Sequence, residues 1–493
     1  MSYILALDEG TTSARAILFD RSAREVAVHS VPIQCHYPHD GWVEQDAEQI
    51  WKAQLAAARS TLGKAQVSVT EIAAIGITNQ RETTIVWDRH TGQAVAPAIV
   101  WQCRRTAGAC RKLVDAGHGP SITAKTGLVV DAYFSGTKIA WILDNVPDAR
   151  RRAEAGDLIF GTVDSWLIYK LTGGRAHVID FTNASRTMLL NLASGLWDDE
   201  LFALLNIPAS MRPQVVPSSG VVATAEASHF GAEIPIAGIA GDQQSALFGQ
   251  ACFRKGLVKN TYGTGCFTLM HTGSAPTVSK NRLIGTIAAS ESAHLQFALE
   301  GSVFVAGALV QWLRDSLGML QTAEHSEKLA MSVPDTAGVY LVPAFVGLGA
   351  PHWDSEARGI MSGLTRATGV AHIVRAALEA IAYQTRELVE AMEADSGAPV
   401  TELRADGGAA ANDFLMQFQA DILGKPVVRP AYIETTALGA AFLAGLATDM
   451  WKSTEELESF WRVDRRFEPG MDSARREELF EGWKHAIERA KLS

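Results

Sequence analysis

The chain has 493 residues, of which 47% are hydrophobic and 20% are charged, and its formal net charge is -10. The length exceeds what one hydrophobic core supports, so we expect two large domains of ordinary globular composition. The acidic charge excludes a nucleic-acid-binding surface, which needs a basic face, but leaves a local nucleotide site open. No apolar run approaches the ~18 residues that a membrane span needs.

The start of the chain and its cysteines indicate a compartment. The N-terminus leads directly into an apolar strand pattern, without a basic segment or a cleavage-like site, so nothing indicates export. The cysteines are odd in number and lack metal-site spacing; they are Cys35, Cys103, Cys110, Cys252 and Cys266. We interpret them as reduced thiols and expect a cytoplasmic protein.

The first predicted element is a hairpin over residues 5–20, where an apolar run ends in Asp8 and a second one follows a polar turn. Asp8 would face a metal from the end of the first strand, and Gly10 would let backbone amides approach an anion. The turn adds three hydroxyl donors, from Thr11, Thr12 and Ser13. An ordinary polar hairpin explains this segment alone equally well.

Further strands and helices alternate along both halves. Apolar runs predict buried strands at 72–77, 159–163, 234–239 and 339–342. Helical patterns lie between them at 47–62, 301–317, 371–393 and 413–423. This mixture predicts an α/β fold.

A second segment of the hairpin's kind begins midway along the chain. In residues 236–249 an apolar strand again meets Gly and Asp242, and residues 260–270 supply another Gly and Thr turn. Two halves that start alike favour a duplicated domain folded around a central cleft. With the boundary near residues 249–256, the expected domains are 1–250 and 251–493.

Three common nucleotide signatures are missing. There is no Gly-x-x-x-x-Gly-Lys-Ser/Thr loop, so a P-loop enzyme is disfavoured. Gly263-Thr264-Gly265 lacks the third glycine of the dinucleotide fingerprint, and the His-Arg-Asp and Asp-Phe-Gly motifs of protein kinases do not occur.

Four turns carry a resemblance together. They are Asp-Glu-Gly-Thr-Thr-Ser at 8–13, Gly-Asp-Gln-Gln at 241–244, Tyr-Gly-Thr-Gly at 262–265 and Asp-Gly-Gly at 406–408. This set resembles the ATPase core shared by sugar kinases, actin and a class of heat-shock chaperones. Residues 133–141 and 359–379 resemble the two signatures of the FGGY carbohydrate kinases, and residues 76–84 and 99–106 resemble the family's glycerol-phosphorylating members.

The resemblance implies two duplicated ribonuclease H-like (actin-like ATPase) domains flanking a central cleft. It also implies ATP-dependent phosphorylation of glycerol to sn-glycerol 3-phosphate, the first step of glycerol catabolism, with Mg²⁺. Glycerol would bind mainly to the first domain and ATP mainly to the second, so that domain closure would join them and exclude water. A homo-oligomer, dimer or tetramer, is implied as well.

The polyol site is carried over onto matching positions. Arg81 would donate to hydroxyl oxygens and Glu82 would accept from hydroxyl hydrogens, because a small triol is oriented by polar contacts. Tyr133 would add a hydroxyl, and Trp101 and Phe267 would pack on the carbon chain. From spacing alone, Arg81 and Glu82 read as a solvated surface pair, and the two aromatics read as core.

Asp242 is the expected catalytic base, since the hydroxyl proton must leave as the bond to phosphorus forms. Gln243 resembles a further substrate contact. A structural alternative is that Asp242 caps the helix that follows it.

The resemblance also implies which residues contact the nucleotide. Arg15 would offer positive charge to the phosphates, and Asp8 would hold Mg²⁺ through water. The other implied contacts are Thr11, Thr12 and Ser13 in the first loop, Thr264 in the second, and Gly307, Gln311, Gly408 and Asn412 around the adenosine. Each residue alone is more often an ordinary turn or helix residue, and their joint spacing carries the assignment.

Three departures from the family pattern stand out. Glu9 replaces the usual Gln and places a carboxyl group near the phosphate loop. Residues 224–233 contain no Lys or Arg, so feedback by fructose 1,6-bisphosphate is disfavoured. His229 in that loop is either a regulatory phosphorylation site or an exposed loop histidine.

Two alternatives belong to other classes. A related pentulose kinase is one, although such enzymes carry different residues at positions 79–82. A non-catalytic nucleotide switch like actin is the other, and it would need a partner surface in place of a polyol pocket. The Arg81 and Glu82 pair with Asp242 favours catalysis.

Overall fold

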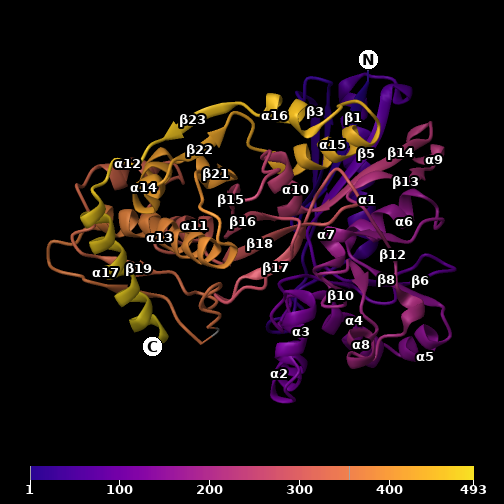
Figure 1. Ribbon diagram of the computed structural model, residues 1–493, viewed down its shortest axis with the longest axis horizontal. Helices are drawn as coiled ribbons and strands as arrows, with labels where there is room; N and C mark the ends of the chain where they lie inside the picture. The colour runs from indigo at the N-terminus through magenta and orange to yellow at the C-terminus, as the bar shows by residue number, and fades with distance from the viewer. Residues whose placement is uncertain (1, 355, 493) are drawn as a thin grey trace.

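The computed structural model describes residues 2–354 and 356–492. Its two largest sheets have six and seven strands, and each sheet is formed by one half of the chain. Figure 1 shows them as two lobes, one coloured indigo to magenta and the other orange to yellow. The predicted α/β class is confirmed.

The first sheet has the strand order β13-β14-β5-β1-β2-β3. Its strands are β1 (Tyr3–Glu9), β2 (Ser13–Phe19), β3 (Glu25–Pro32), β5 (Ile72–Asn79), β13 (Ser219–Ala225) and β14 (Ile234–Gly241). The first three form an antiparallel meander, β5 and β14 continue parallel to β1, and β13 closes the edge antiparallel. The predicted hairpin and the strands at 72–77 and 234–239 are confirmed.

The second sheet repeats this pattern in the order β17-β18-β16-β15-β21-β22-β23. Its strands are β15 (Val258–Tyr262), β16 (Cys266–Gly273), β17 (Ile284–Ala288), β18 (Gln296–Val303), β21 (Leu403–Asp406), β22 (Val427–Pro430) and β23 (Val463–Phe467). An antiparallel meander of β15, β16 and β18 is again followed by two parallel strands and an antiparallel edge strand. The shared order confirms the predicted duplication, with β17 added at one edge.

Helices from both halves cover the first sheet. On one face, Leu7 and Ile75 pack against α1 (Ala47–Ala65) and α6 (Val163–Leu171). The opposite face, with Ile4 and Phe19, packs against α15 (Thr435–Ala447), which comes from the end of the chain. In Figure 1 the yellow α15 accordingly lies among the indigo strands.

Two helices lie where the halves meet, α10 (Asp242–Gly249) and α15, and they pack against each other very closely. A Cβ added at Gly439 would lie 1.9 Å from the backbone oxygen of Ser245, and one at Gly249 would lie 2.0 Å from that of Thr435. Leu247 of α10 also packs in a cluster with Leu269 of the second sheet. Each half therefore contributes one helix to the neighbourhood of the other.

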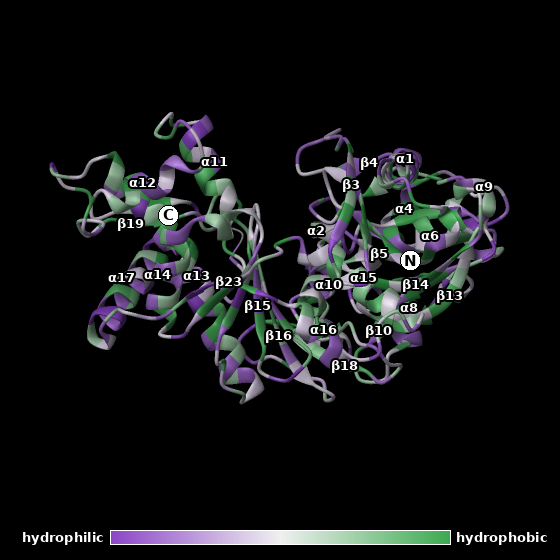
Figure 2. Ribbon diagram, turned by 90° about the horizontal axis from the view of Figure 1, so that it is seen from above, coloured by the Kyte–Doolittle hydropathy of each residue, from purple (hydrophilic) through white to green (hydrophobic). Residues whose placement is uncertain are grey.

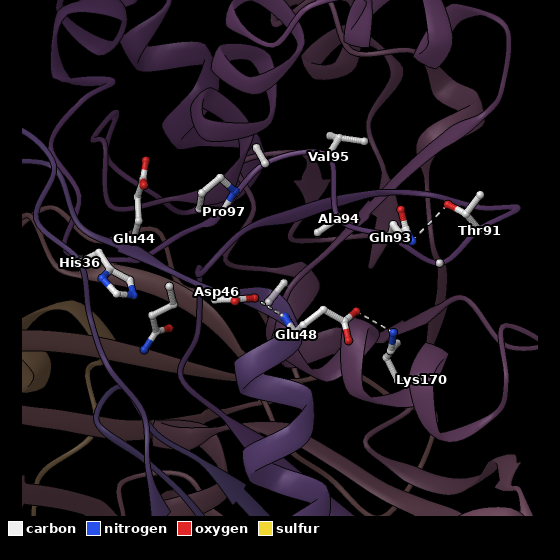
Figure 3. Close-up of a pocket in the computed structure, with 14 residues that line it drawn as sticks. His36, Glu44, Asp46, Glu48, Thr91, Gln93, Ala94, Val95, Pro97 and Lys170 are labelled. Carbon is white, nitrogen blue, oxygen red and sulfur yellow. Dashed lines mark hydrogen bonds and ion pairs between the residues drawn. The ribbon is translucent and has the colours of Figure 1, made fainter.

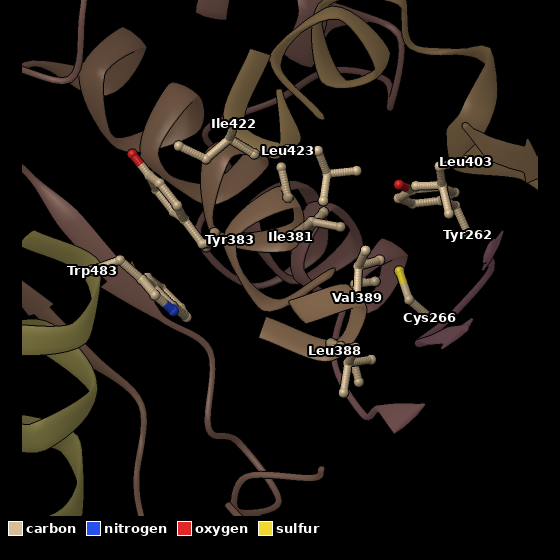
Figure 4. Packing of buried hydrophobic residues seen from close by; sticks show 14 of the residues in the cluster. Tyr262, Cys266, Ile381, Tyr383, Leu388, Val389, Leu403, Ile422, Leu423 and Trp483 are labelled. Atoms are coloured by element: carbon tan, nitrogen blue, oxygen red, sulfur yellow. The ribbon is translucent and has the colours of Figure 1, made fainter. Parts of the chain in front are cut away.

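The core of the second half lies between its sheet and three helices, α13 (Val370–Ser396), α14 (Asp413–Leu423) and α17 (Ser473–Lys491). Figure 4 shows this packing, in which Tyr383 stacks on Trp483 with ring centroids 5.3 Å apart. The predicted helices at 47–62, 371–393 and 413–423 are confirmed, as is the strand at 339–342, observed as β19 (Tyr340–Val342). Figure 2 shows the hydrophilic α17 on the outside of this lobe.

Two sequence predictions are partly wrong. Residues 301–303 complete β18 instead of starting a helix, and α11 (Gly307–Asp315) begins only after them. Likewise β8 (Leu158–Gly161) ends before Val163, which starts α6. At both positions a strand is followed directly by a helix in a mostly apolar stretch. The spacing of apolar residues does not distinguish a buried strand from a buried helix there.

The remaining elements are short. They are β4 (Glu44–Gln45), β6 (Ile85–Asp88), β7 (Ala98–Ile99), β9 (Val178–Asp180), β10 (Leu190–Asn191), β11 (Leu196–Trp197), β12 (Gln214–Val216), β20 (Ile360–Ser362), α2 (Ala107–Asp115), α3 (Gly119–Thr126), α4 (Ser135–Asn145), α5 (Ala149–Glu154), α7 (Phe181–Ala184), α8 (Asp199–Leu204), α9 (Ala227–Phe230), α12 (His325–Met331) and α16 (Thr454–Phe460), with 3-10 turns at Val69–Glu71, Ala209–Met211 and Gly408–Ala411. Within residues 2–354 and 356–492, no helix combines the length and apolarity needed to cross a membrane.

The close contact of α10 with α15 makes a direct prediction. Gly439→Ala should lower the free energy of unfolding by about 3 kcal/mol or more, because the new methyl group meets a backbone oxygen that cannot turn away. Gly63→Ala is the matched helical control, since nothing lies within 4 Å of a Cβ there. That variant should be neutral or stabilised by up to ~1 kcal/mol. Urea unfolding of both proteins measures the difference, and equal stabilities would contradict the packing described.

Candidate functional site

Arg81 lies just after β5 and is buried where the two halves meet. Its Nη1 and Nη2 donate to both carboxylate oxygens of Glu300, and its Nε lies 3.0 Å from Oδ1 of Asp242. Nη1 also donates to Gln244 at 3.2 Å, and Nη2 donates to the Tyr133 hydroxyl at 3.4 Å. The four N–H groups of Nη1 and Nη2 therefore each have an acceptor, and Nε lies beside the Asp242 carboxylate.

Glu82 is buried beside Arg81 and has a left-handed backbone, with φ of 60°. Its carboxylate accepts from Arg186 Nε at 2.6 Å, and Arg186 Nη2 donates to Glu300 at 2.9 Å. The backbone oxygen of Glu82 accepts from Lys138 Nζ at 3.0 Å. A non-glycine residue in this conformation persists only where its surroundings hold it, as these contacts do.

The charges of this cluster are strongly coupled. Burial raises the pKa of Glu300, but the guanidinium groups of Arg186 and Arg81 outweigh burial and lower it to about 2. Burial also raises the pKa of Glu82, and Arg186 only partly offsets it. Glu300 is thus ionised at neutral pH and holds both arginines.

The three aromatic residues predicted for the polyol site lie together. The ring of Trp101 packs edge to face with Tyr133 at 5.7 Å and with Phe267 at 6.5 Å. Trp101 Nε1 donates to the Thr11 hydroxyl at 2.9 Å. The aromatic wall is thereby joined to the predicted phosphate turn.

Asp242 is the first residue of α10, and the helix cap is Gly241. Asp242 is therefore not the N-cap residue of this helix, although its side chain binds one N–H group of the first turn. Oδ1 accepts from Gln243 N at 2.7 Å and faces Arg81, whereas Oδ2 receives no hydrogen bond from residues 2–354 or 356–492. With 31% of its side chain exposed, this carboxylate has one oxygen available to a ligand.

Gln243 has an unexpected partner in the second half. Its Oε1 accepts from the fully buried Lys259 Nζ, which also donates to Thr261 at 2.8 Å. Burial lowers the pKa of Lys259 to about 8, although the charges of Asp406 and Asp242 oppose the shift. The side-chain oxygen of Gln243 is already hydrogen-bonded within the protein. Only the N–H groups of its side-chain amide can therefore bind a substrate.

The phosphate turn is closed by a hydrogen bond from Gly10 N to Ser13 O at 3.0 Å, and Thr12 is exposed at its tip. Arg15 lies behind the turn, paired with Glu434 and 3.9 Å from Oδ2 of Asp8. Burial raises the pKa of Asp8 to about 6; Arg15 opposes this, while Glu434 and Asp242 add to it.

Asp8 fits the role predicted for it. Its coupling to Asp242 places the two carboxylates around one region, and Mg²⁺ binds through one or two carboxylates, water and substrate phosphates. No group of three or more His, Cys, Asp or Glu side chains within residues 2–354 and 356–492 could hold a metal ion. The metal role of Asp8 stays a prediction.

The predicted second phosphate loop and the predicted adenosine contacts spread over three segments. Thr264 lies in a loop held against the start of α11, where Gly307 N donates to Gly263 O at 2.9 Å. Gln311 on α11 is exposed, and so is Gly408 in its 3-10 turn. Asn412 caps α14 through a bond from Leu415 N at 2.9 Å, so its side-chain oxygen is already occupied.

Two of the three departures from the family pattern have a structural reading. Glu9 is fully buried, and burial raises its pKa well above the usual range, with Gln80 opposing the shift and Asp8 adding to it. The ring of His229 packs on Trp51 with centroids 5.1 Å apart, and its Nε2 is buried. This nitrogen is closed to a phosphorylating partner, and the regulatory hypothesis stays a prediction for Nδ1.

A hollow of about 810 Å³ opens on the first half. Figure 3 shows its lining, where Glu48 pairs with Lys170 at 2.7 Å and Asp46 caps α1. Gln45 in the lining donates to the backbone oxygen of Thr11, but none of the predicted site residues lines the hollow. We therefore place the site at the charge cluster and not at this hollow.

Three site residues stand in no motif that sequence reasoning used, namely Arg186, Glu300 and Lys259. Glu300 is a single charge inside a mostly apolar strand pattern, and that signal could have identified it. Lys138 lies inside the segment 133–141 quoted for the family signature, but its contacts were not predicted.

Comparisons with known proteins agree along the whole chain. The N-terminal domain of the FGGY family of carbohydrate kinases matches residues 3–249, and the C-terminal domain of that family matches residues 258–448. The chain is 60% identical over 491 residues to the glycerol kinase of Aromatoleum aromaticum, covering 100% of this chain and 99% of that protein. It is 59% identical over 490 residues to the glycerol kinase of Carboxydothermus hydrogenoformans, covering 99% and 98%.

Solved structures match equally broadly. The crystal structure of Plasmodium falciparum glycerol kinase with ADP has a TM-score of 0.94 at 35% identity, covering 99% of this chain and 98% of that one. A ligand-bound xylulose kinase from Lactobacillus acidophilus has a TM-score of 0.90 at 22% identity, covering 100% and 99%, and shows the shared fold.

The buried Lys138 allows a pH-dependent prediction. Its Nζ donates to the backbone oxygens of Tyr133 at 2.7 Å and Glu82 at 3.0 Å, and burial lowers its pKa from 10.5 to about 7. Lys138→Met removes both bonds. The Glu82 oxygen keeps the hydroxyls of Thr84 and Ser135 as donors, whereas the Tyr133 oxygen loses its Lys138 bond. The free energy of unfolding should therefore fall by about 1–3 kcal/mol.

The pH dependence has a defined sign. Between its native pKa of about 7 and its unfolded pKa of 10.5, Lys138 binds a proton only in the unfolded chain. The wild type should therefore gain stability relative to Lys138→Met as pH rises from 7, by up to about 1.4 kcal/mol per pH unit. Urea unfolding from pH 7 to 10 measures this, with the exposed Lys52→Met as control. Parallel curves for wild type and Lys138→Met would contradict the assignment.

Proposed function

Because this chain belongs to the FGGY family of carbohydrate kinases, we propose that it transfers the γ-phosphoryl group of ATP to glycerol and forms sn-glycerol 3-phosphate. The observation that supports glycerol as the substrate is the 60% identity, over essentially the full length, to a relative named glycerol kinase. ATP as donor is supported by the kinase family and by the ADP-bound structural relative. The site geometry adds a chemical reason for each step.

Glycerol enters beside the aromatic wall of Trp101, Tyr133 and Phe267. Its hydroxyl groups replace part of the ion pair between Arg81 and Asp242. Glu82 accepts the hydrogen of a further hydroxyl group. Three aromatic rings restrict the length of the acceptor. Since these charged groups are buried, their bonds to the triol are stronger than in water and fix its orientation.

Asp242 acts as the general base. Its Oδ2, which receives no bond from the described part of the chain, accepts the proton of the attacking hydroxyl, while Arg81 at Oδ1 keeps the carboxylate oriented. The hydroxyl oxygen then attacks the γ-phosphorus in line as the bond to ADP breaks. Position and charge stabilisation supply most of the catalysis in such transfers.

The phosphates lie between the two Gly and Thr turns. Thr11, Thr12, Ser13 and Thr264 donate to them, and Arg15 turns from Glu434 toward them. Asp8 would hold Mg²⁺, and the ion would neutralise charge on the phosphate oxygens. The adenosine lies on the second half near Gly307, Gln311, Gly408 and Asn412.

Three predictions of the family resemblance remain. They are a domain boundary at residue 250 with glycerol bound mainly before it and ATP mainly after it, a cytoplasmic location, and a homo-oligomer, either dimer or tetramer. They are tested by ADP binding to point variants, by fractionation and by sedimentation.

The function is tested by ADP release with glycerol, with D-xylulose and without an acceptor. Glycerol should give at least tenfold more ADP than the other two conditions. Asp242→Asn should lower kcat by about 10²–10⁴, because an amide cannot accept the proton. ADP affinity should stay unchanged.

Asp199→Asn is the matched control, since Asp199 also starts a short helix and pairs with an arginine, the half-buried Arg212, but is itself exposed to solvent. It should retain wild-type rates. ADP release that needs no acceptor and is insensitive to Asp242→Asn would instead indicate a nucleotide switch.

A further inference from the structure

Glu300 comes from β18 of the second half, yet it lies fully buried between two arginines of the first half. Oε1 accepts from Arg186 Nη2 at 2.9 Å and from Arg81 Nη2 at 3.2 Å, and Oε2 accepts from Arg81 Nη1. Arg81 thus receives a bidentate carboxylate across the contact between the halves.

Strand alternation explains why Glu300 faces the first half. Its neighbour Leu299 packs in the core of the second half, and a Cβ at Gly301 would lie 2.6 Å from Leu388 of α13. Successive side chains of a strand point to opposite faces, so Glu300 points away from α13. The sheet itself presents this carboxylate to Arg81.

The bidentate contact fixes the plane of the Arg81 guanidinium. Because the group is planar, holding Nη1 and Nη2 also fixes the position of Nε, which lies 3.0 Å from Oδ1 of Asp242. The same plane directs the second Nη2 hydrogen to the Tyr133 hydroxyl. Both of these neighbours are residues that the proposed function assigns to glycerol.

Without Glu300, the cluster would hold two buried guanidinium groups and only Glu82 and Asp242 to compensate them. Arg81 would then be drawn toward these two carboxylates, which glycerol must reach. A buried ion pair is weak support for stability in itself, so a positioning role explains this placement better than a stabilising one.

We propose that Glu300 is a positioning residue for the polyol site: it orients Arg81 toward Asp242 and Tyr133 and makes polyol affinity depend on contact between the two halves. The inference rests on the proposed function, since it takes glycerol as the ligand of Arg81. Glu300 itself touches no substrate.

The test is Glu300→Gln. The amide places an NH₂ group where guanidinium N–H groups point, so Arg81 or Arg186 loses an acceptor in either orientation of the amide. The KM for glycerol should rise about tenfold or more, while the Kd for ADP, measured by titration calorimetry, should change less than twofold. A general loss of structure would move both constants.

Glu402→Gln is the matched control. Glu402 also lies between two arginines, Arg404 at 3.2 Å and Arg466 at 2.8 Å, at the outer side of the second half. It should leave the KM for glycerol unchanged. If Glu300→Gln does not fold, Glu300→Asp replaces it, since this variant keeps the charge and shortens the side chain. The KM for glycerol and the Kd for ADP are then compared in the same way.

An unchanged KM for glycerol in the folded variant would overturn the proposal, and so would a matching rise in the Kd for ADP. If the wild type shows no glycerol-dependent ADP release, the proposed function fails and this inference fails with it.

Discussion

Two arginines and two glutamates lie fully buried where the halves of the chain meet, and these four charges compensate one another. Taking an ion out of water costs several kcal/mol unless a partner is well placed, so Arg81, Glu82, Arg186 and Glu300 tolerate only a narrow range of arrangements. The arrangement observed requires the second sheet to stand where β18 reaches the first half. The positions of Tyr133 and Asp242 follow from it, since both contact Arg81.

Local signals predicted much of the fold. Residues 413–423 form the expected helix to the residue, because Asn412 caps one end and Gly424 takes the left-handed conformation at the other. The first hairpin followed from Gly10 and the hydroxyl residues beside it. The strand conformation of residues 301–303 was not predicted, because the mostly apolar stretch that contains them continues from a strand into a helix. Only their pairing with β16 distinguishes the strand from the helix.

The predicted site residues share a neighbourhood that motifs alone define incompletely. Trp101, Tyr133 and Phe267 meet at one wall, and Arg81, Glu82 and Asp242 lie in contact beside it. Glu300 lies 219 residues from Arg81 in the chain, so no spacing rule connects them. Arg186 and Lys259 were missed for the same reason. Such partners are set by tertiary packing, and the sequence signals only that a lone charge within an apolar strand needs one.

The covering of the first sheet has a consequence for how the protein is made. All six of its strands have been synthesised by residue 241, but the face that includes Ile4 and Phe19 is covered by α15, which ends at Ala447. The nascent first half therefore carries an open apolar face while most of the second half is still being translated. Such a face invites aggregation, and we expect it to be occupied by a chaperone until the chain is nearly complete.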